Sequence, residues 1–187
     1  MSKLVIGLAG SIGAGKGTAA AYLVRKYGAD IFIFSGFLRQ ILKILHQEPS
    51  RTGIGILSKL LRDTYGADIF SRVAVHAIEE SEHWIIVIDG VRRISDLDGI
   101  RENPNFKLLY IDADLQTRYE RILSRAQNSG DSEKTFEQFL VEEDGETEVS
   151  IRTLKPYSSC LVENDKTEAE FYAAIDAFVE ENLPKSL

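Results

Sequence analysis

Apolar residues follow one another with few polar interruptions in five short stretches of the sequence. These stretches are residues 3–8, 31–34, 84–89, 106–112 and 160–162. Runs that lack the alternation of a half-buried strand are typical of strands covered on both faces. The segments between them have helical periodicity over residues 18–27, 37–46, 56–65, 69–80, 115–125, 135–154 and 168–183. Strands that alternate with helices predict a three-layer α/β fold, with a parallel five-stranded sheet between helices.

Composition narrows the class of protein without identifying a function. The 187 residues are 44% hydrophobic and 27% charged, as expected for one globular domain over residues 1–187. The net charge of −7 argues against a nucleic-acid polymer as the main partner, because no basic excess exists to displace its counterions. Cys160 is the single cysteine, which favours a reducing, cytoplasmic location. No run approaches the roughly 18 apolar residues that span a bilayer, and we expect neither a signal peptide nor a membrane partner.

A glycine-rich stretch follows the first predicted strand and precedes the first predicted helix. The sequence Gly10-Ser-Ile-Gly-Ala-Gly-Lys16 fits the pattern G-x-x-x-x-G-K, which in this context binds phosphate. Glycines let several backbone N–H groups point at one anion, and the helix adds the positive end of its dipole. The predicted ATP-binding residues of this loop are Gly10, Gly13, Ala14, Gly15, Lys16, Gly17 and Thr18. Lys16 is also a catalytic candidate, because its charge can reach the β- and γ-phosphates. The alternative is a glycine-rich turn without a ligand.

The residue after the lysine is Gly17, where this pattern usually has the Ser or Thr that binds Mg²⁺. Thr18 comes next and is our candidate for that hydroxyl ligand, although water could take the position instead. Asp89 ends the predicted strand at residues 84–89 and is the second metal candidate, because carboxylates at strand ends can hold Mg²⁺. The alternative for Asp89 is a helix cap or turn residue. A dinucleotide pattern G-x-G-x-x-G is excluded, since position 18 is threonine.

Several arginines follow strands at the edge of the sheet where ligands gather. Arg39 and Arg92 are expected to bind the phosphate of an acceptor, because a guanidinium grips phosphate through two hydrogen bonds. Arg118, Arg121 and Arg125 share one face of a predicted helix and lead into the polar residues 127–134, which predicts a basic lid with a mobile loop. The alternative in each case is a solvated side chain.

These motifs resemble those of small-molecule P-loop kinases, specifically nucleoside monophosphate kinases and dephospho-CoA kinase. GAGKGT is similar to the loop of adenylate kinases, and Ser35-Gly-Phe-Leu-Arg39 is similar to their acceptor segment. IDADLQTRYERILSR resembles a dephospho-CoA kinase segment in which Arg121 and Arg125 match catalytic arginines. LVEN, ending at Asn164, resembles the closing strand and the asparagine beside the adenine of ATP. DGVRRISDLDGIR is similar to uncharacterised predicted nucleotide kinases. The resemblance implies a helical acceptor-binding region near residues 36–80 and a lid near residues 121–150.

One departure affects the expected acceptor. Dephospho-CoA kinases have acidic residues at the end of the second strand, where this sequence has Phe34 and Ser35. We therefore expect transfer of the γ-phosphoryl group of ATP, with Mg²⁺, to a nucleoside monophosphate or a similar phosphorylated metabolite. The alternatives are dephospho-CoA as acceptor, or a regulatory P-loop ATPase without a small-molecule acceptor. The base and sugar of the acceptor and the oligomeric state stay open.

Overall fold

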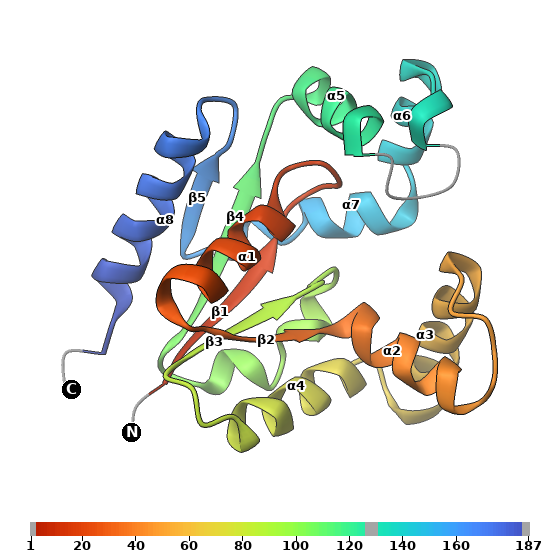
Figure 1. The fold of residues 1–187 in the computed structure, drawn as a ribbon. Helices are drawn as coiled ribbons and strands as arrows, with labels where there is room; N and C mark the ends of the chain where they lie inside the picture. The colour runs from red at the N-terminus through yellow and green to blue at the C-terminus, as the bar shows by residue number, and fades with distance from the viewer. Residues whose placement is uncertain (1–2, 126–130, 185–187) are drawn as a thin grey trace.

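The computed structural model describes residues 3–125 and 131–184 and contains a five-stranded sheet with helices on both faces (Figure 1). Its strand order is β2-β3-β1-β4-β5, and every neighbouring pair is parallel. The strands are β1 (Leu4–Ala9), β2 (Asp30–Ile33), β3 (Ile85–Asp89), β4 (Phe106–Asp112) and β5 (Cys160–Glu163). The predicted α/β class and parallel sheet are therefore confirmed.

The central strand β1 places the glycine loop at the middle of the sheet. All six of its residues are buried, as expected for an apolar run between two layers of helices. β1 pairs with β3 on one side, where Leu8 is opposite Asp89, and with β4 on the other, where Ala9 is opposite Tyr110. The loop after β1 therefore lies at the carboxyl edge of the sheet, between the segments that follow β3 and β4.

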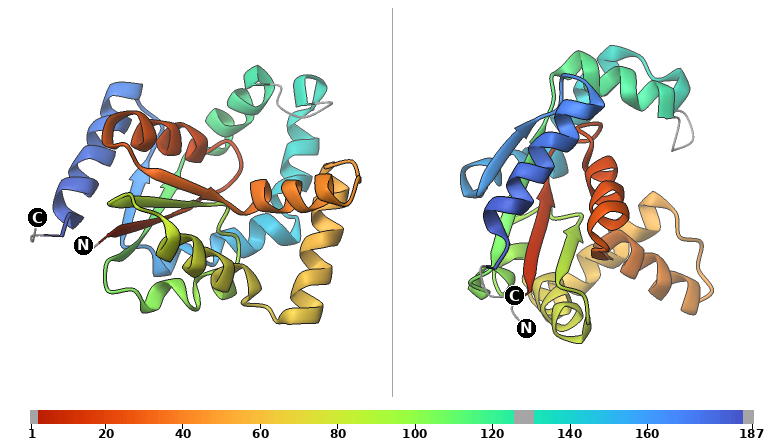
Figure 2. Two further views of the ribbon diagram at one scale, coloured as in Figure 1. Left: turned by 60° about the horizontal axis from the view of Figure 1, so that its bottom comes forward. Right: turned by 60° about the vertical axis from the view of Figure 1, so that its left-hand side comes forward.

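Alternate residues of the strands point into two separate cores. Leu4, Ile6 and Leu8 belong to the core under α1 (Lys16–Tyr27) and α8 (Glu168–Asn182). Val5 and Ala9 belong to the opposite core, which includes side chains from α2 (Phe34–Ile44), α3 (Arg51–Tyr65), α4 (Ile69–Glu80) and α7 (Glu146–Arg152). The period of two along a strand explains this division, and Figure 2 shows the two helical layers from further sides.

Helix boundaries follow local signals that the sequence displays. α1 ends where Gly28 adopts a left-handed conformation and its N–H bonds to carbonyls of the last turn. α4 and α5 (Leu115–Arg125) coincide with the predicted segments. The carboxylate of Asp114 accepts hydrogen bonds from the backbone and hydroxyl of Thr117, so Asp114 caps α5.

The structure corrects several predicted boundaries. The helix predicted over residues 56–65 begins at Arg51. The helix predicted over residues 135–154 is divided into α6 (Phe136–Glu143) and α7, separated by Asp144 and Gly145. The second strand ends at Ile33, and α2 already begins at Phe34, so the segment from Ser35 to Arg39 lies inside the helix. A short apolar run does not distinguish a strand from the first turn of a buried helix, which explains the last difference.

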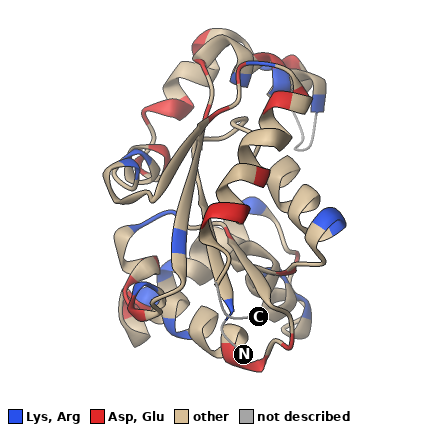
Figure 3. Ribbon diagram, turned by 90° about the vertical axis from the view of Figure 1, so that its left-hand side faces the viewer, with Lys and Arg blue, Asp and Glu red and all other residues tan. Residues whose placement is uncertain are grey.

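The surface carries charges of both signs. Figure 3 shows Lys and Arg interspersed with Asp and Glu over the molecule. Within residues 3–125 and 131–184, no helix is long and apolar enough to cross a membrane. The mobile loop expected over residues 127–134 lies mostly outside the described residues; its last part includes a short 3₁₀ turn at Asp131–Glu133.

Candidate phosphate-binding site

Residues 10–15 form a tight loop between β1 and α1, and close neighbours force glycine at three of its positions, two of which have the tightest contacts. Gly10 has φ +140°, and a Cβ there would lie 2.0 Å from the carbonyl oxygen of Ile111. Gly15 has φ +111°, and its Cβ would lie 2.2 Å from Nδ2 of Asn164. A Cβ at Gly17, by contrast, would have no neighbour within 4 Å among the described residues. The loop is therefore fixed against β4 and β5, while the first turn of α1 faces open space.

Lys16 is the first residue of α1, and its side chain folds back over the loop. Its Nζ donates to the carbonyl oxygens of Gly10 at 2.6 Å and Ser11 at 3.0 Å. Burial lowers the pKa of Lys16, because the loop removes water from the charged ammonium. A phosphate beside Nζ would add negative charge that stabilises the ammonium.

Four other charged side chains act on Lys16 from three different segments. The negative charges of Asp89 and Glu148 raise its pKa, and Asp89 has the larger effect of the two. The positive charges of Arg92 and Arg125 lower it. Asp89 and Arg92 come from the end of β3, Arg125 from the end of α5 and Glu148 from α7. The structure thus brings four of the predicted site residues, Lys16, Asp89, Arg92 and Arg125, into one electrostatic neighbourhood.

Asn164, directly after β5, is hydrogen-bonded to the glycine loop. Its side-chain amide donates to the carbonyl of Ala14 at 2.8 Å, and its backbone N–H donates to Asp112 at 2.8 Å. Nη2 of Arg121 donates to the carbonyl of Asn164 at 2.7 Å. Nη1 of Arg121 is buried and, among the described residues, has no hydrogen-bond acceptor. A buried hydrogen-bond donor without a partner costs free energy. A ligand oxygen that accepts a hydrogen bond from Nη1 of Arg121 would remove this cost. That Asn164 lies beside the adenine of bound ATP stays a prediction.

The three arginines of α5 lie on one helix as expected, but they occupy three different environments. Arg118 is 5% exposed and binds both carboxylate oxygens of Glu143 at 2.7 and 2.6 Å. Burial works against its charge, but the hydrogen bonds and charge of Glu143 raise the pKa of Arg118. Arg121 is half-buried, and Arg125 is exposed. Arg118 packs against the glycine loop, where a Cβ on Gly13 would touch its backbone, and this proximity removes it from solvent.

The turn after β3 is held by a fully buried carboxylate. Oδ2 of Asp96 accepts from the backbone N–H groups of Arg92 and Arg93 at 2.9 and 3.0 Å, and Oδ1 binds Arg62 at 2.6 Å. The backbone at Arg92 is therefore fixed while its side chain is exposed. Asp96 and Arg62 were not predicted as partners, since they lie 34 residues apart in sequence.

Arg39 lies on the exposed side of α2 and makes no hydrogen bond or ion pair with the described residues. The neighbouring Phe34 and Leu38 are buried and anchor the helix against the sheet. Arg39 is not among the charged groups with the largest effects on the pKa of Lys16. The structure thus gives Arg39 an anchored backbone and a free guanidinium on a different element from the donor loop.

The oxygen donors available for a metal suit Mg²⁺. Thr18 is exposed in the first turn of α1, and Asp89 is half-buried at the end of β3. No group of three or more His, Cys, Asp or Glu residues with metal-site geometry occurs in the described parts of the chain. Mg²⁺ commonly uses one or two carboxylates and completes its octahedron with substrate phosphates and water. A hydroxyl and a carboxylate beside a phosphate loop fit that requirement.

Glu148 is a site residue that sequence reasoning missed. Its Oε2 accepts a hydrogen bond from the backbone N–H of Ile12, inside the glycine loop, at 3.2 Å. The two residues are 136 positions apart, so only the packing of α7 brings them together. Residues 135–154 show no motif that could have indicated this contact. Figure 1 shows α7 beside the loop between β1 and α1.

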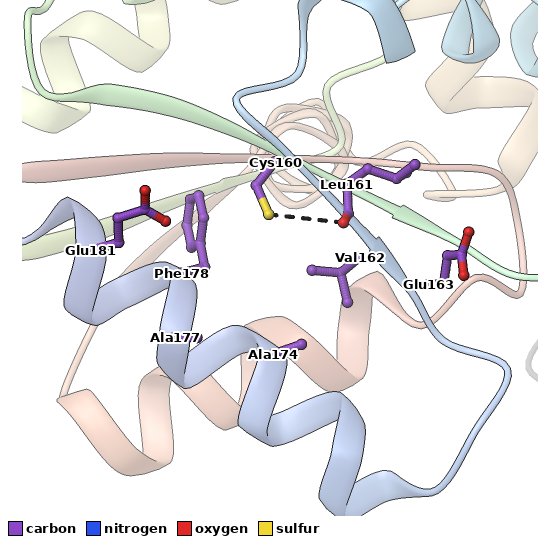
Figure 4. A pocket seen from close by; sticks show the side chains of 8 residues that line it. All are labelled: Cys160, Leu161, Val162, Glu163, Ala174, Ala177, Phe178 and Glu181. Atoms are coloured by element: carbon purple, nitrogen blue, oxygen red, sulfur yellow. Dashed lines mark hydrogen bonds between the residues drawn. The ribbon is translucent and has the colours of Figure 1, made fainter.

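A separate groove of about 390 Å³ lies between β5 and α8 (Figure 4). Cys160 and Glu163 contribute from β5, and Phe178 and Glu181 from α8. No Lys or Arg is among its eight lining residues. Burial raises the pKa of the Cys160 thiol, which disfavours the reactive thiolate. The groove therefore does not suit phosphate and is not part of the site around Lys16.

The strand order, the glycine loop after the central strand and the lysine that opens α1 define the class: a P-loop NTPase. A family model described as an AAA domain matches residues 9–139, and the chain belongs to that family.

Relatives and solved structures are consistent with this assignment. The UPF0200 protein of Methanoculleus marisnigri is 27% identical over 176 residues, covering 94% of each chain. The UPF0200 protein of Hyperthermus butylicus is 24% identical over 91% of this chain and 90% of its own. TT1252 from Thermus thermophilus has a similar fold, with a TM-score of 0.62 and 16% identity over 97% of this chain and 98% of that one. Shikimate kinase from Bacteroides thetaiotaomicron has a TM-score of 0.60 and 13% identity over 95% and 97%.

Proposed function

We propose that the protein transfers the γ-phosphoryl group of ATP to a nucleoside monophosphate or a similar phosphorylated metabolite. The carrying observation is that the loop with Lys16 lies at the carboxyl edge of the sheet, between the segment with Arg92 after β3 and the helix with Arg125 after β4. The charges of both arginines act on Lys16. A site that binds only nucleotide needs the loop and its lysine. Additional arginines from opposite segments suit a reaction in which a second anion meets the terminal phosphate.

The donor half of the proposed reaction uses groups that are already in place. Backbone N–H groups of the loop and the N-terminus of α1 bind the β- and γ-phosphates. Lys16 exchanges its two carbonyl acceptors for phosphate oxygens and supplies a positive charge in a poorly hydrated position. When bound, Mg²⁺ would supply positive charge that offsets the negative charge developing on the phosphates. Thr18 and Asp89 are the residues that would hold it, directly or through water.

The acceptor half rests on Arg39 and Arg92, whose exposed guanidinium groups have no hydrogen bond or ion pair with residues 3–125 and 131–184. Ile33, Phe34 and Ser35 at the end of β2 supply no carboxylate that could take a proton from a hydroxyl acceptor. A monophosphate needs no such base, because its oxygen is already ionised near neutral pH. This chemistry favours an anionic acceptor over dephospho-CoA.

In the proposed transfer, the acceptor oxygen bonds to the γ-phosphorus while the bond from that phosphorus to the β,γ-bridging oxygen breaks. ADP leaves with that oxygen. Arg125 is exposed at the end of the helix beside the loop and can reach the charge on the moving phosphoryl group. Arg121 lies deeper, at Asn164, and its Nη1 has no hydrogen-bond partner within the described part of the chain, so it could donate to a ligand oxygen. Both arginines favour water exclusion and charge stabilisation over simple nucleotide binding.

A regulatory ATPase without a small-molecule acceptor is the second candidate, because the donor loop alone would serve it. Initial rates of ADP formation with ATP and Mg²⁺ should be measured with each of the common nucleoside monophosphates, with dephospho-CoA and with no acceptor. We expect at least one monophosphate to raise the rate well above that without acceptor, and Lys16→Ala to abolish the increase while the protein stays folded. Lys16-dependent ATPase activity that no acceptor stimulates would favour the regulator, and faster transfer to dephospho-CoA would reverse our ranking of acceptors.

A further inference from the structure

A carboxylate from outside the glycine motif lies on the phosphate loop. Oε2 of Glu148 is 3.2 Å from the backbone nitrogen of Ile12, which donates to it. Ile12 is the third residue of the stretch from Gly10 to Lys16, whose N–H groups serve phosphate in loops of this type. A nucleotide phosphate and Glu148 would therefore require the same backbone donor.

Glu148 also resembles a bound phosphate in its electrostatic effect on Lys16. Its negative charge raises the pKa of Lys16, opposing the effect of burial on the ammonium. A hydrogen-bonded carboxylate near a lysine in a loop that excludes water is the electrostatic pattern that a phosphate oxygen would produce. The free loop is thus partly neutralised by a group of the protein itself.

Two further contacts connect α6 and α7 to the surroundings of Ile12. Nη1 of Arg118 approaches the carbonyl oxygen of Ile12 at 3.3 Å, and the same guanidinium binds Glu143 on α6. On α7, Glu146 binds Arg93 at 3.0 Å, beside the Arg92 of the proposed acceptor site. The helices α6 and α7 are therefore connected to the donor loop and to the turn after β3 at once.

We propose that Glu148 occupies the phosphate position of the loop in the nucleotide-free protein and that nucleotide phosphates displace it, releasing the first turn of α7 from the loop. The inference rests on the donor site of the proposed function. Two anions cannot share one N–H donor and one ammonium without strong repulsion, so binding of phosphate and the contact of Glu148 exclude each other.

Displacement of Glu148 reduces the apparent affinity for nucleotide by the fraction of molecules in which the contact is open. Neutralising Glu148 should remove most of this reduction, because a neutral acceptor forms the weaker hydrogen bond and does not repel phosphate. If the contact is closed in about nine molecules of ten, the expected gain in affinity is roughly tenfold. The gain should appear for any ligand whose phosphates enter the loop, whatever its base.

The experiment is a calorimetric titration of the full chain with Mg·ADP and with inorganic tripolyphosphate, which has no base or sugar. Glu148→Gln and Glu148→Ala should each bind both ligands roughly tenfold more tightly than the wild type. Asp144→Asn is the matched control, because it removes the same charge from an exposed position just before α7. Its affinity should change by less than about twofold, as exposed charges are screened by water and salt. Circular dichroism verifies that each variant is folded.

Each outcome separates this inference from the proposed function. Tighter binding in both Glu148 variants and not in the control supports it. Unchanged or weaker binding, or an equal gain in Asp144→Asn, overturns it while Lys16-dependent binding by the wild type leaves the donor site intact. If neither the wild type nor the Glu148 variants bind ADP, both the donor site and the inference fail.

Discussion

On the donor side of the site, Lys16 is bonded to two loop carbonyls, and Asn164 holds a third. On the acceptor side, the guanidinium groups of Arg39 and Arg92 have no hydrogen bond or ion pair with any residue that the structure describes. The donor loop is therefore already formed before phosphate binds, and only the contacts of Lys16 and Glu148 must be exchanged, whereas the arginines lose side-chain freedom when a ligand orders them.

This difference explains why the class of protein is evident and its substrate is not. A preformed loop imposes a fixed geometry, so it reveals the group that it binds. Exposed arginines can bind many anions, so they indicate only that the acceptor is negatively charged. Knowledge of the acceptor must therefore come from experiments that act on the acceptor side without disturbing the donor side.

The largest expected effect is that of Arg125, which connects the two sides. Arg125→Ala should lower kcat on the order of 10³-fold, the scale of an arginine that stabilises a moving phosphoryl group. Affinity for ATP should change by less than about tenfold, because the interaction exists mainly in the transition state. Arg125→Lys should restore little activity, since an ammonium lacks the planar fork. Steady-state kinetics with a direct ATP titration test this, and near-normal kcat would move the catalytic role to Arg121, Arg92 or Arg93.

The buried ion pair between Arg118 and Glu143, next to the donor loop, should stabilise the fold. Glu143→Ala leaves the guanidinium of Arg118 buried without its bidentate partner, and we expect the free energy of unfolding to fall by about 3–5 kcal/mol. The exposed pair of Lys59 and Asp63 is the comparison, because Asp63→Ala should cost no more than about 0.5 kcal/mol. Urea titrations of both variants measure the difference. Equal losses would mean that Arg118 finds another partner.

Substitutions of the two acceptor-side arginines should have a smaller effect, which is confined to binding of the acceptor. Arg92→Ala and Arg39→Ala should raise the KM for the acceptor by roughly 10- to 100-fold, as expected for a hydrogen bond between charged groups worth about 1.5–3 kcal/mol. The melting temperature and the affinity for ATP should hardly change, because neither side chain supports the fold. Acceptor and ATP titrations on each variant decide this. Loss of ATP affinity instead would place that arginine in the donor site.

The smallest effect concerns pH. Phosphate oxygens should raise the pKa of Lys16 in the complex above its lowered value in the free protein, so nucleotide binding takes up a proton. Affinity should then fall as pH rises through the lowered pKa, by up to about tenfold per pH unit. Acceptor binding should not follow this trend, because arginines stay charged. ADP titrations above pH 8, where the phosphates are fully ionised, check the slope. Lys16→Arg should be flat, and an identical slope in that variant would exclude Lys16 as the cause.

The sequence by itself determined the strands, most helix boundaries and the phosphate loop, because each depends on residues close together in the chain. The buried run of β1, the left-handed Gly28 and the spacing from Gly10 to Lys16 are signals of this kind. Arg92 and Asp89 could also be placed, since residues after parallel strands converge at one edge of the sheet.

Only the tertiary structure decided which charged side chains are partners. Arg118, Arg121 and Arg125 have the same residue type and similar spacing, yet one is buried against Glu143, one is bonded to Asn164 and one is exposed. The break between α6 and α7 directs Glu148 to the loop, and neither its helix nor its neighbours in sequence indicate that contact. Ion pairs and shared hydrogen-bond donors depend on distances between segments that are far apart in the chain, and a linear pattern does not contain those distances.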